Sequence, residues 1–223
     1  MVIVIDGPAG SGKSSTARAV AKKLGIQYID SGALYRAVAL IYIKTPDEKV
    51  FFDRLKQANI SFQYVDERFE VFVNDENVTL ALRQTAVSKQ VSAVAAKKRV
   101  RTFVNALMRE TVKQGIYIAE GRDLGTAVFP AAAVKFFMTA DIEKRAKRRF
   151  LELKEAKTDI NIQEVYENIL SRDRSDRRRT NDPLKKAPEA IEIDTSEMSF
   201  EEQVDKICSI IKAETKINFK QKS

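Results

Sequence analysis

The first fifteen residues contain glycine, lysine and serine at the spacing of a phosphate-binding loop. The apolar run Val2–Ile5 precedes Gly7-Pro8-Ala9-Gly10-Ser11-Gly12-Lys13-Ser14-Ser15. In such a loop the glycines let backbone N–H groups curl around an anion, and the following helix points its positive N-terminus at the same spot. The lysine adds a positive charge, and the serine hydroxyl suits a Mg²⁺ ion between the β and γ phosphates of a nucleotide. A glycine-rich turn that happens to contain a lysine is the alternative, but a strand before the pattern and an amphipathic helix after it favour nucleotide binding.

Four further polar clusters each follow an apolar run that reads as a strand. They are Asp30-Ser31, Glu120-Gly121-Arg122-Asp123, Thr139–Asp141 and Asp194-Thr195. Ligands of parallel α/β sheets gather at the carboxyl ends of the strands, so we expect these clusters and the phosphate loop to meet on one rim. Asp30 and Ser31 could equally serve as a helix cap, because both residue types are preferred there.

The most basic stretch of the chain is Arg172–Arg179, where seven of eight residues are charged. It follows the polar segment 154–161, which lacks periodicity and is predicted to be a mobile connection. A charged helix behind a mobile segment favours a lid that closes over bound nucleotides. The alternative is a solvated helix end stabilised by the helix dipole.

Strands and helices alternate along most of the chain. Apolar runs predict strands at 2–5, 26–29, 116–119, 134–138 and 191–193. Helical periodicity predicts helices near 15–24, 30–42, 46–58, 84–96, 99–113, 141–153, 162–179 and 200–211. Period-two alternation in 60–65 and 69–73, with a short run at 78–79, predicts a small inserted antiparallel sheet. The pattern indicates an α/β fold, a parallel sheet with helices on both faces; from about Thr215 onward the chain is expected to be frayed.

Composition limits the function classes. With 223 residues, 44% of them hydrophobic, the chain suffices for one α/β core with a small lobe. The net charge of +8 suggests anionic partners, and because no nucleic-acid-binding signature accompanies it we expect none of them to be nucleic acid. The chain has no histidine, which excludes histidine catalysis and histidine metal sites. The single cysteine, Cys208, is expected to pack in a reducing cytoplasm, and neither a membrane span nor a signal peptide is expected.

Together these segments resemble the bacterial-type cytidylate kinases. The resemblance runs in order through the phosphate loop, Asp30–Arg36, the inserted sheet, Ser92, Arg101, Glu120–Thr126 and Arg172–Arg179. It implies one P-loop NTPase-like domain over 1–223 with a five-stranded parallel core. It also implies that 59–83 form the inserted sheet of a monophosphate-binding lobe and that 154–180 form a short lid. The implied reaction transfers the γ-phosphoryl group of ATP, bound as MgATP, to CMP or dCMP, giving CDP or dCDP and ADP.

The same resemblance assigns site residues. ATP is assigned to 7–15, catalysis to Lys13, Arg122 and Arg179, and magnesium to Ser14. The acceptor phosphate is assigned to Ser31, Arg36, Arg122 and Arg179, the cytosine to Ser92, Arg101 and Asp123, and the ribose to Arg172 and Asp176. The chain departs from the family pattern at Lys97-Lys98, where relatives often have a proline. It also departs around Thr79–Arg83, where an acidic residue often seen in the family is replaced by Ala81 or a neighbour.

Two other functions remain open at this point. One is a P-loop kinase with a different acceptor, such as UMP or a non-nucleotide metabolite, because the phosphate loop does not discriminate between acceptors. The other is a nucleotide-dependent switch or RNA-binding GTPase, which is disfavoured because the sequence lacks an Asn-Lys-x-Asp guanine motif. The chain is expected to act as a monomer.

Overall fold

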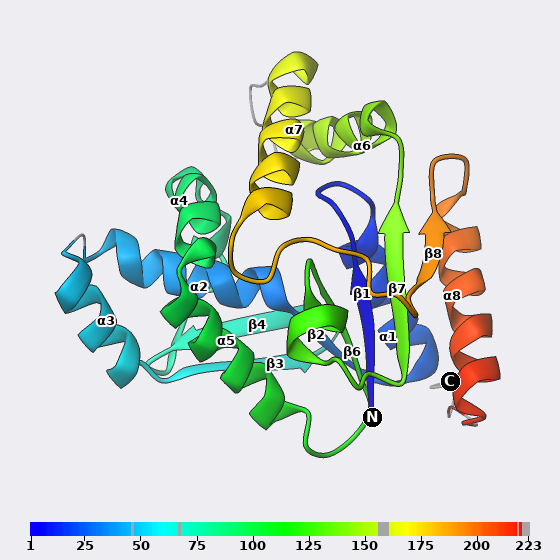
Figure 1. Ribbon diagram of the computed structural model, residues 1–223, viewed down its shortest axis with the longest axis horizontal. Helices are drawn as coiled ribbons and strands as arrows, with labels where there is room; N and C mark the ends of the chain where they lie inside the picture. The colour runs from blue at the N-terminus through cyan, green and yellow to red at the C-terminus, as the bar shows by residue number, and fades with distance from the viewer. Residues whose placement is uncertain (46, 67, 156–160, 218, 220–223) are drawn as a thin grey trace.

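A computed structural model of the chain describes residues 1–45, 47–66, 68–155, 161–217 and 219. Its centre is a five-stranded sheet in the order β2-β6-β1-β7-β8, and all four neighbouring pairs are parallel (Figure 1). The strands are β1 (Val2–Asp6), β2 (Gln27–Asp30), β6 (Tyr117–Gly121), β7 (Val134–Thr139) and β8 (Ile191–Asp194). The five predicted strands are therefore confirmed, each within a residue or two.

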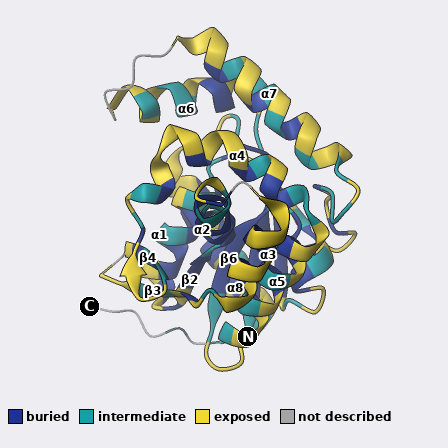
Figure 2. Cartoon of the chain, turned by 90° about the vertical axis from the view of Figure 1, so that its left-hand side faces the viewer, coloured by how far each residue is buried: buried dark blue, intermediate teal, exposed yellow. Residues whose placement is uncertain are grey.

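The central strand β1 is apolar because both of its faces are covered. Ile3, Val4 and Ile5 are fully buried. Helix α1 (Lys13–Leu24) packs on β6 and β2, and α8 (Phe200–Thr215) packs on α1 and β7. The β1-to-β2 and β6-to-β7 connections run in opposite directions along the sheet, so right-handed crossovers place them on opposite faces. Figure 2 shows the sheet as the buried centre of the molecule.

Three helices form a layer beside β2 and β6. They are α2 (Ser31–Ile43), α4 (Thr85–Ala96) and α5 (Lys98–Thr111), and α2 contacts both of the others. The break between α4 and α5 is present although no proline stands there. Lys97 has an extended backbone with ψ 123° and serves as the C-cap of α4 and the N-cap of α5. The departure from the family pattern at Lys97-Lys98 thus leaves the two predicted helices intact.

The inserted segment forms a separate antiparallel sheet in the order β3-β4-β5, preceded by α3 (Glu48–Gln57). Strands β3 (Ile60–Val65) and β4 (Arg68–Val73) match the prediction. The third strand is β5 (Glu76–Asn77) rather than Val78-Thr79, because Asn77 and Glu76 pair with Phe72 and Val73. Two short turns were not predicted, a 3₁₀ turn at Ala81–Arg83 and a π-type turn at Leu124–Val128.

Helices α6 (Ile142–Glu155) and α7 (Ile162–Arg178) pack together as a hairpin beyond the ends of the strands (Figure 1). Their outer faces are largely exposed, whereas the residues between them are buried (Figure 2). Most of the predicted connection 154–161 lies outside the described residues, because 156–160 are not described. Helix α8 ends at Thr215, and the predicted fraying beyond it falls largely on residues 218 and 220–223, which are also not described.

Gly25 caps α1 in the left-handed conformation, with a φ of 65°, which favours glycine. Cys208 is buried, with a free thiol. Within the part of the chain that the structure describes, no helix combines the length and apolar character needed to cross a membrane.

Candidate active site

Three of the polar segments at strand ends, namely the phosphate loop, Asp30-Ser31 and Glu120–Asp123, surround one cavity of about 130 Å³ at the carboxyl ends of the strands. It lies between the phosphate loop, the start of α2, the middle of α4, the end of β6 and the last turns of α7. Among the residues predicted to form the site, those that line it are Lys13, Ser14, Ser31, Arg36, Ser92, Arg122, Asp123, Arg172, Asp176 and Arg179. The structure therefore brings the predicted phosphate, base and ribose residues together, and the roles assigned to them stay predictions.

The phosphate loop needs glycine where its backbone is strained or crowded. A Cβ atom on Gly7 would lie 2.1 Å from the backbone oxygen of Met138, so no side chain fits there. Gly12, the N-cap of α1, has a φ of 89°, in the left-handed region that favours glycine. These two constraints fix the loop where β1 ends and α1 begins, so that the N-terminal N–H groups of α1 face the cavity edge at Lys13 and Ser14.

Glu120, at the end of β6, holds the two functional side chains of the phosphate loop. Its carboxylate accepts a hydrogen bond of 2.7 Å from the Ser14 hydroxyl and lies 3.8 Å from the Lys13 ammonium. Lys13 also donates to the backbone oxygen of Pro8 at 3.2 Å. Sequence reasoning noted Glu120 only as part of a polar cluster, since its partners become visible only when β1 and β6 pair in register.

Burial dominates the electrostatics of this pair. It lowers the pKa of Lys13 to about 8, with Arg122 lowering it further and Glu120 opposing. Burial likewise raises the pKa of Glu120, with Asp30 adding to the effect and Lys13 opposing it. Burial thus disfavours the charged forms of both side chains. A phosphate bound beside Lys13 would supply a negative charge and would favour the protonated, charged form of Lys13.

A second group of charges surrounds Asp123, which is only 3% exposed. One carboxylate oxygen accepts a hydrogen bond from Arg101, and the other accepts one of 2.7 Å from Arg179. Burial raises the pKa of Asp123, while Arg101 and then Arg179 lower it. The Asp123 carboxylate therefore depends on both guanidinium groups to remain charged.

Arg101 does not line the cavity but lies directly behind Asp123, 2% exposed. Its Nε donates to Asp182 at 2.6 Å and one terminal nitrogen donates to the Ala95 oxygen at 3.2 Å. Sequence reasoning missed Asp182, which lies beyond the basic run in a segment without periodicity. Arg179 donates to the backbone oxygen of Asp182 at 2.7 Å, so the segment after α7 supports the base region.

Arginines gather at the part of the cavity assigned to phosphate and ribose. Arg122 donates to Asp176 at 2.9 Å. Burial, followed by repulsion from Arg122 and Arg36, lowers the pKa of Arg172 to about 10, with Asp176 opposing. The guanidinium groups here outnumber the carboxylates, and this local excess of positive charge favours binding of a phosphate dianion.

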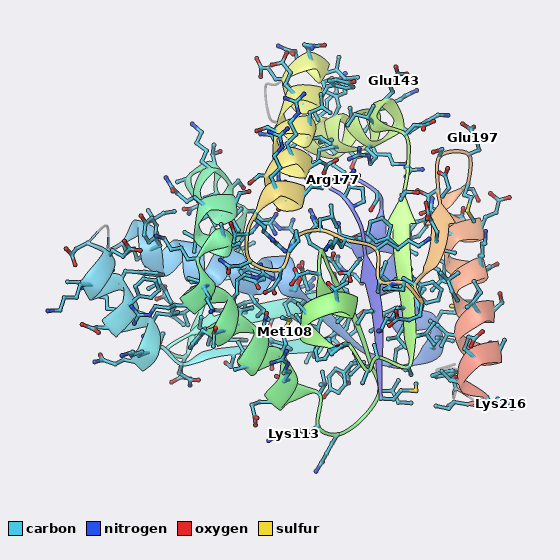
Figure 3. The ribbon with its side chains drawn as sticks, in the orientation of Figure 1. Met108, Lys113, Glu143, Arg177, Glu197 and Lys216 are labelled. Atoms are coloured by element: carbon cyan, nitrogen blue, oxygen red, sulfur yellow. The ribbon has the colours of Figure 1, made fainter. Side chains whose placement is uncertain are left out.

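The basic run of α7 divides into two faces. Arg172, Asp176 and Arg179 face the cavity, while the intervening Arg174, Arg177 and Arg178 are exposed. Figure 3 shows the end of α7 that carries Arg177 directed toward the ends of the strands. One face of the run therefore lines the cavity and the other is solvated, and closure of this segment over nucleotides stays a prediction.

Three residues, Asp30, Ser31 and Asp6, show how the framework positions the cavity wall. The Asp30 side chain accepts a hydrogen bond of 2.9 Å from the Ala33 N–H, which is a helix cap, and the Ser31 hydroxyl donates to the Glu120 backbone oxygen at 2.7 Å. Asp6 accepts hydrogen bonds from the N–H groups of Leu124 and Gly125 at 2.9 and 2.7 Å. Burial raises the pKa of Asp6 to about 6, opposed by these two bonds. Asp6 thereby ties β1 to the turn that follows Asp123.

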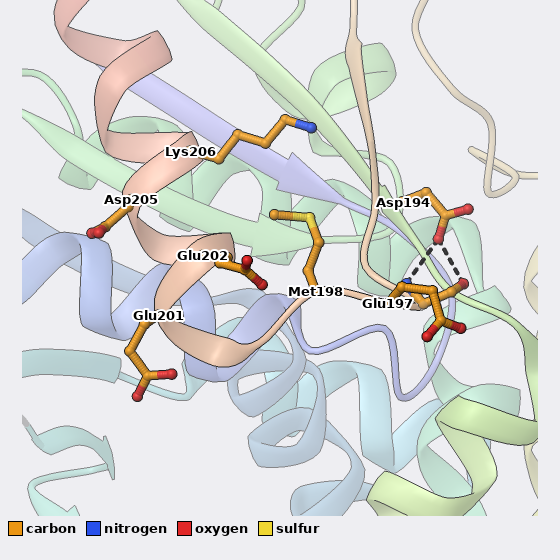
Figure 4. A pocket seen from close by; sticks show the side chains of 8 residues that line it. Asp194, Glu197, Met198, Glu201, Glu202, Asp205 and Lys206 are labelled. Atoms are coloured by element: carbon orange, nitrogen blue, oxygen red, sulfur yellow. Dashed lines mark hydrogen bonds between the residues drawn. The ribbon is translucent and has the colours of Figure 1, made fainter.

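The cluster at Asp194-Thr195 does not reach this cavity. Asp194 instead edges a separate, open hollow of about 670 Å³ between β8 and α8, with Glu197, Glu201, Glu202 and Asp205 (Figure 4). Asp194 accepts hydrogen bonds from the N–H and the hydroxyl of Ser196, which lowers its pKa. The hollow is predominantly acidic and would repel phosphate. Thr139–Asp141 also lie outside the cavity. Both clusters nevertheless meet the phosphate loop, because the Thr195 hydroxyl donates to the Ser11 backbone oxygen at 3.2 Å and the Thr195 N–H donates to the Thr139 oxygen at 2.9 Å. The prediction that the clusters meet on one rim is therefore confirmed, although these two do not line the cavity.

Comparison with known proteins agrees with this arrangement. A family model described as "Cytidylate kinase" matches residues 3–213. A cytidylate kinase from Carboxydothermus hydrogenoformans is 40% identical over 215 residues, covering 95% of this chain and 97% of that protein. One from Lactobacillus gasseri is 40% identical over 220 residues, covering 97% and 96%. The crystal structure of an uncharacterized protein from Eubacterium ventriosum, 10% identical and covering 98% of this chain and 99% of that one, has a TM-score of 0.51, a similarity of fold alone.

Proposed function

The chain belongs to the cytidylate kinase family, and from this premise we propose that it transfers the γ-phosphoryl group of ATP to CMP or dCMP, giving CDP or dCDP and ADP. One observation carries the proposal: a single cavity joins Lys13 and Ser14 of the phosphate loop to Asp123 and to arginines from α2, from the turn after β6 and from the end of α7. Donor and acceptor phosphates would meet between them.

The acceptor needs charge neutralisation rather than a base. The phosphate of a nucleoside monophosphate is already anionic near neutral pH, so its oxygen is a nucleophile without help from a histidine. The reaction requires instead that two mutually repelling anions be held in line and that charge on the moving phosphoryl group be cancelled. Lys13, Arg122 and Arg179 supply fixed positive charge for this purpose, and Ser31 and Arg36 complete the acceptor site.

The base would be recognised by the Asp123 group. Cytosine presents an amino donor at position four, for which a carboxylate is the natural partner. Uracil presents a carbonyl there, which would face an acceptor in a buried pocket. Arg101 and Ser92 would complete the base edge, and Arg172 and Asp176 would contact the ribose. An alternative acceptor such as UMP is therefore not favoured.

Magnesium fits the residues at the loop. Mg²⁺ in phosphate-transfer sites is held by substrate phosphates, water and one or two protein oxygens. The Ser14 hydroxyl and the Glu120 carboxylate are hydrogen-bonded to each other at the cavity edge and supply such oxygens. They would hold the ion of MgATP, which neutralises charge on the β and γ phosphates when bound.

The cavity must enlarge to admit substrates. Its volume of about 130 Å³ is below the roughly 300–1,000 Å³ of typical ligand pockets. The α7 side chains that close it belong to the proposed lid, 154–180, while 59–83 belong to the proposed monophosphate lobe. Opening of α7 would admit the nucleotides, and closure would exclude water, whose attack would hydrolyse ATP.

We further propose that the protein acts as a monomer in the cytoplasm. The buried, unpaired Cys208 is compatible with a reducing compartment. Sedimentation of the purified protein measures the first point directly: a species of twice the chain mass of 25.2 kDa would contradict it.

The proposed function is tested by coupling ADP release to a visible readout with MgATP and each nucleoside monophosphate in turn. We expect CMP and dCMP to support turnover. Equal turnover with UMP, or ADP release independent of any acceptor, would contradict the proposal.

A further inference from the structure

Ala9, in the phosphate loop, is held from two sides by the α6–α7 hairpin. Its N–H donates to one carboxylate oxygen of Asp173 on α7 at 3.0 Å. Its carbonyl oxygen accepts a hydrogen bond of 2.9 Å from Arg145 on α6. Arg145 also donates to the other carboxylate oxygen of Asp173 at 2.5 Å, so the three residues form a closed ring of hydrogen bonds.

This ring is buried. Ala9, Arg145 and Asp173 are 4%, 7% and 7% exposed. Ala9 also packs in a small apolar cluster whose other buried members, Ala146, Val165 and Ile169, all come from α6 and α7. The loop residue therefore belongs to the core of the hairpin rather than to the core of the sheet.

The ring fixes the direction of the loop backbone without touching the cavity. Ala9, Arg145 and Asp173 are not among the residues that line it. Arg145 is itself anchored by donating from Nε to the Ala140 oxygen at 2.9 Å, just beyond β7. The next residue, Gly10, leaves so little space that an added Cβ would lie 3.1 Å from the Arg145 oxygen. The peptide planes on both sides of Ala9 thus take their orientation from the hairpin.

We propose that Arg145 and Asp173 are positioning residues that latch the α6–α7 hairpin to the phosphate loop, so that docking of the hairpin sets the loop for the donor triphosphate. The inference rests on the proposed function for the identity of the donor. When the hairpin moves away from the loop, the buried hydrogen bonds of Ala9 with Asp173 and Arg145 are broken. The N–H groups of the loop are then no longer held in one orientation. Hairpin closure and donor binding are on this account the same event.

The test uses four variants of the full chain. Asp173→Ala removes both bonds made by the carboxylate, whereas Asp173→Asn retains an acceptor for the Ala9 N–H and loses the charge. Arg145→Ala with Asp173→Ala removes both buried charges together, which guards against misfolding caused by one uncompensated charge. Glu152→Gln is the control, because its partner Arg149 lies on the same helix and both side chains are exposed.

Three measurements are made on each variant: MgATP affinity, the KM for CMP and amide exchange. Calorimetry with MgATP alone should show affinity lowered about tenfold in Asp173→Ala and in the double variant, and about threefold in Asp173→Asn. The KM for CMP should rise less than the dissociation constant for MgATP, because only the cavity face of α7, with Arg172, Asp176 and Arg179, is proposed to contact CMP. Glu152→Gln should match the unmodified chain. In the Asp173→Ala and double variants without ligand, amide exchange should be faster than in the unmodified chain, both in residues 6–12 and in α6 and α7.

The latch would be refuted if exchange rose in α6 and α7 while residues 6–12 and MgATP affinity were unchanged. It would also be refuted if the KM for CMP rose as much as the dissociation constant for MgATP, because that result indicates general loss of structure. Failure of the unmodified chain to phosphorylate CMP would contradict the proposed function, and calorimetry and exchange would still decide on the latch.

Discussion

Replacing Asp123 with asparagine tests whether this carboxylate recognises the base. The change conserves shape but removes the charge, and the two Asp123 oxygens accept from Arg101 and Arg179 in the structure. An asparagine has one acceptor oxygen, so its NH₂ group must face one of the two guanidinium donors. One buried charge-assisted hydrogen bond is lost, at a cost of about 1.5–3 kcal/mol.

That cost predicts both a stability change and a specificity change. For a chain of this size, 1 kcal/mol corresponds to roughly 2–4 °C in Tm, so the Tm of Asp123→Asn should fall by roughly 3–12 °C. In the unmodified protein, UMP would place its carbonyl against the Asp123 carboxylate, and neither acceptor would have a donor. The value of kcat/KM for CMP should therefore exceed that for UMP by roughly a hundredfold or more. The amide introduced by Asp123→Asn can donate to the uracil carbonyl, so the ratio should fall toward roughly ten.

The assay is coupled ADP release with CMP and UMP at saturating MgATP, with Tm measured on the same preparations. Asp182→Asn is the matched control, because it removes a carboxylate from the same Arg101 guanidinium but at a position whose side chain is 36% exposed. Its stability cost should stay below about 1 kcal/mol, with a smaller change in base preference. Full CMP preference in Asp123→Asn would show that Asp123 does not recognise the base.

Four further predictions follow from the residues around the cavity. Lys13→Ala should lower kcat about a thousandfold while the protein stays folded by circular dichroism, because Lys13 serves the transferring group; near-normal turnover would refute the P-loop assignment. The value of kcat/KM for ATP should fall as pH rises through about 8, where free Lys13 loses its proton, and this fall should be absent in Lys13→Arg. Since the unfolded lysine keeps its proton to a higher pH, the Lys13 contribution to stability should instead increase as pH rises from about 8 to 10.5, which urea titrations at several pH values measure. Binding of both nucleotides should protect α7 residues 170–178 from amide exchange, and equal protection with and without ligands would leave the run as a solvated helix end.

The sequence predicted most of the fold because local patterns agree with burial. Strand β1 reads as a continuous apolar run because it is covered on both faces, and the inserted strands alternate because one face is exposed. The third inserted strand was placed two residues late, since Val78 is buried and apolar whereas the paired residues, Glu76 and Asn77, are polar. The hydrophobicity of the side chains at 76–79 therefore does not indicate which of these residues pair with β4 through their backbone.

The sequence predicted which residues form the site but not the hydrogen bonds and ion pairs between them. Arginines, a phosphate loop and strand-end carboxylates are visible in the sequence, and so is the family resemblance that assigns them. The ion pairs of Asp182 and Asp173 with arginines 81 and 28 residues away were not predicted, because only the folded chain brings those side chains together. The Asp194-Thr195 cluster ends the edge strand β8, so it meets the phosphate loop at Ser11 and does not line the cavity beside β1 and β6.

The central claim is phosphoryl transfer from ATP to a cytidine monophosphate, and a competition experiment tests it most directly. The protein is incubated with γ-labelled MgATP and an equimolar mixture of CMP, UMP, AMP and GMP, and the labelled products are separated. We predict that the label appears in CDP, with labelled UDP lower by roughly a hundredfold. Label that appears equally in UDP and CDP, or only in inorganic phosphate, would contradict the account.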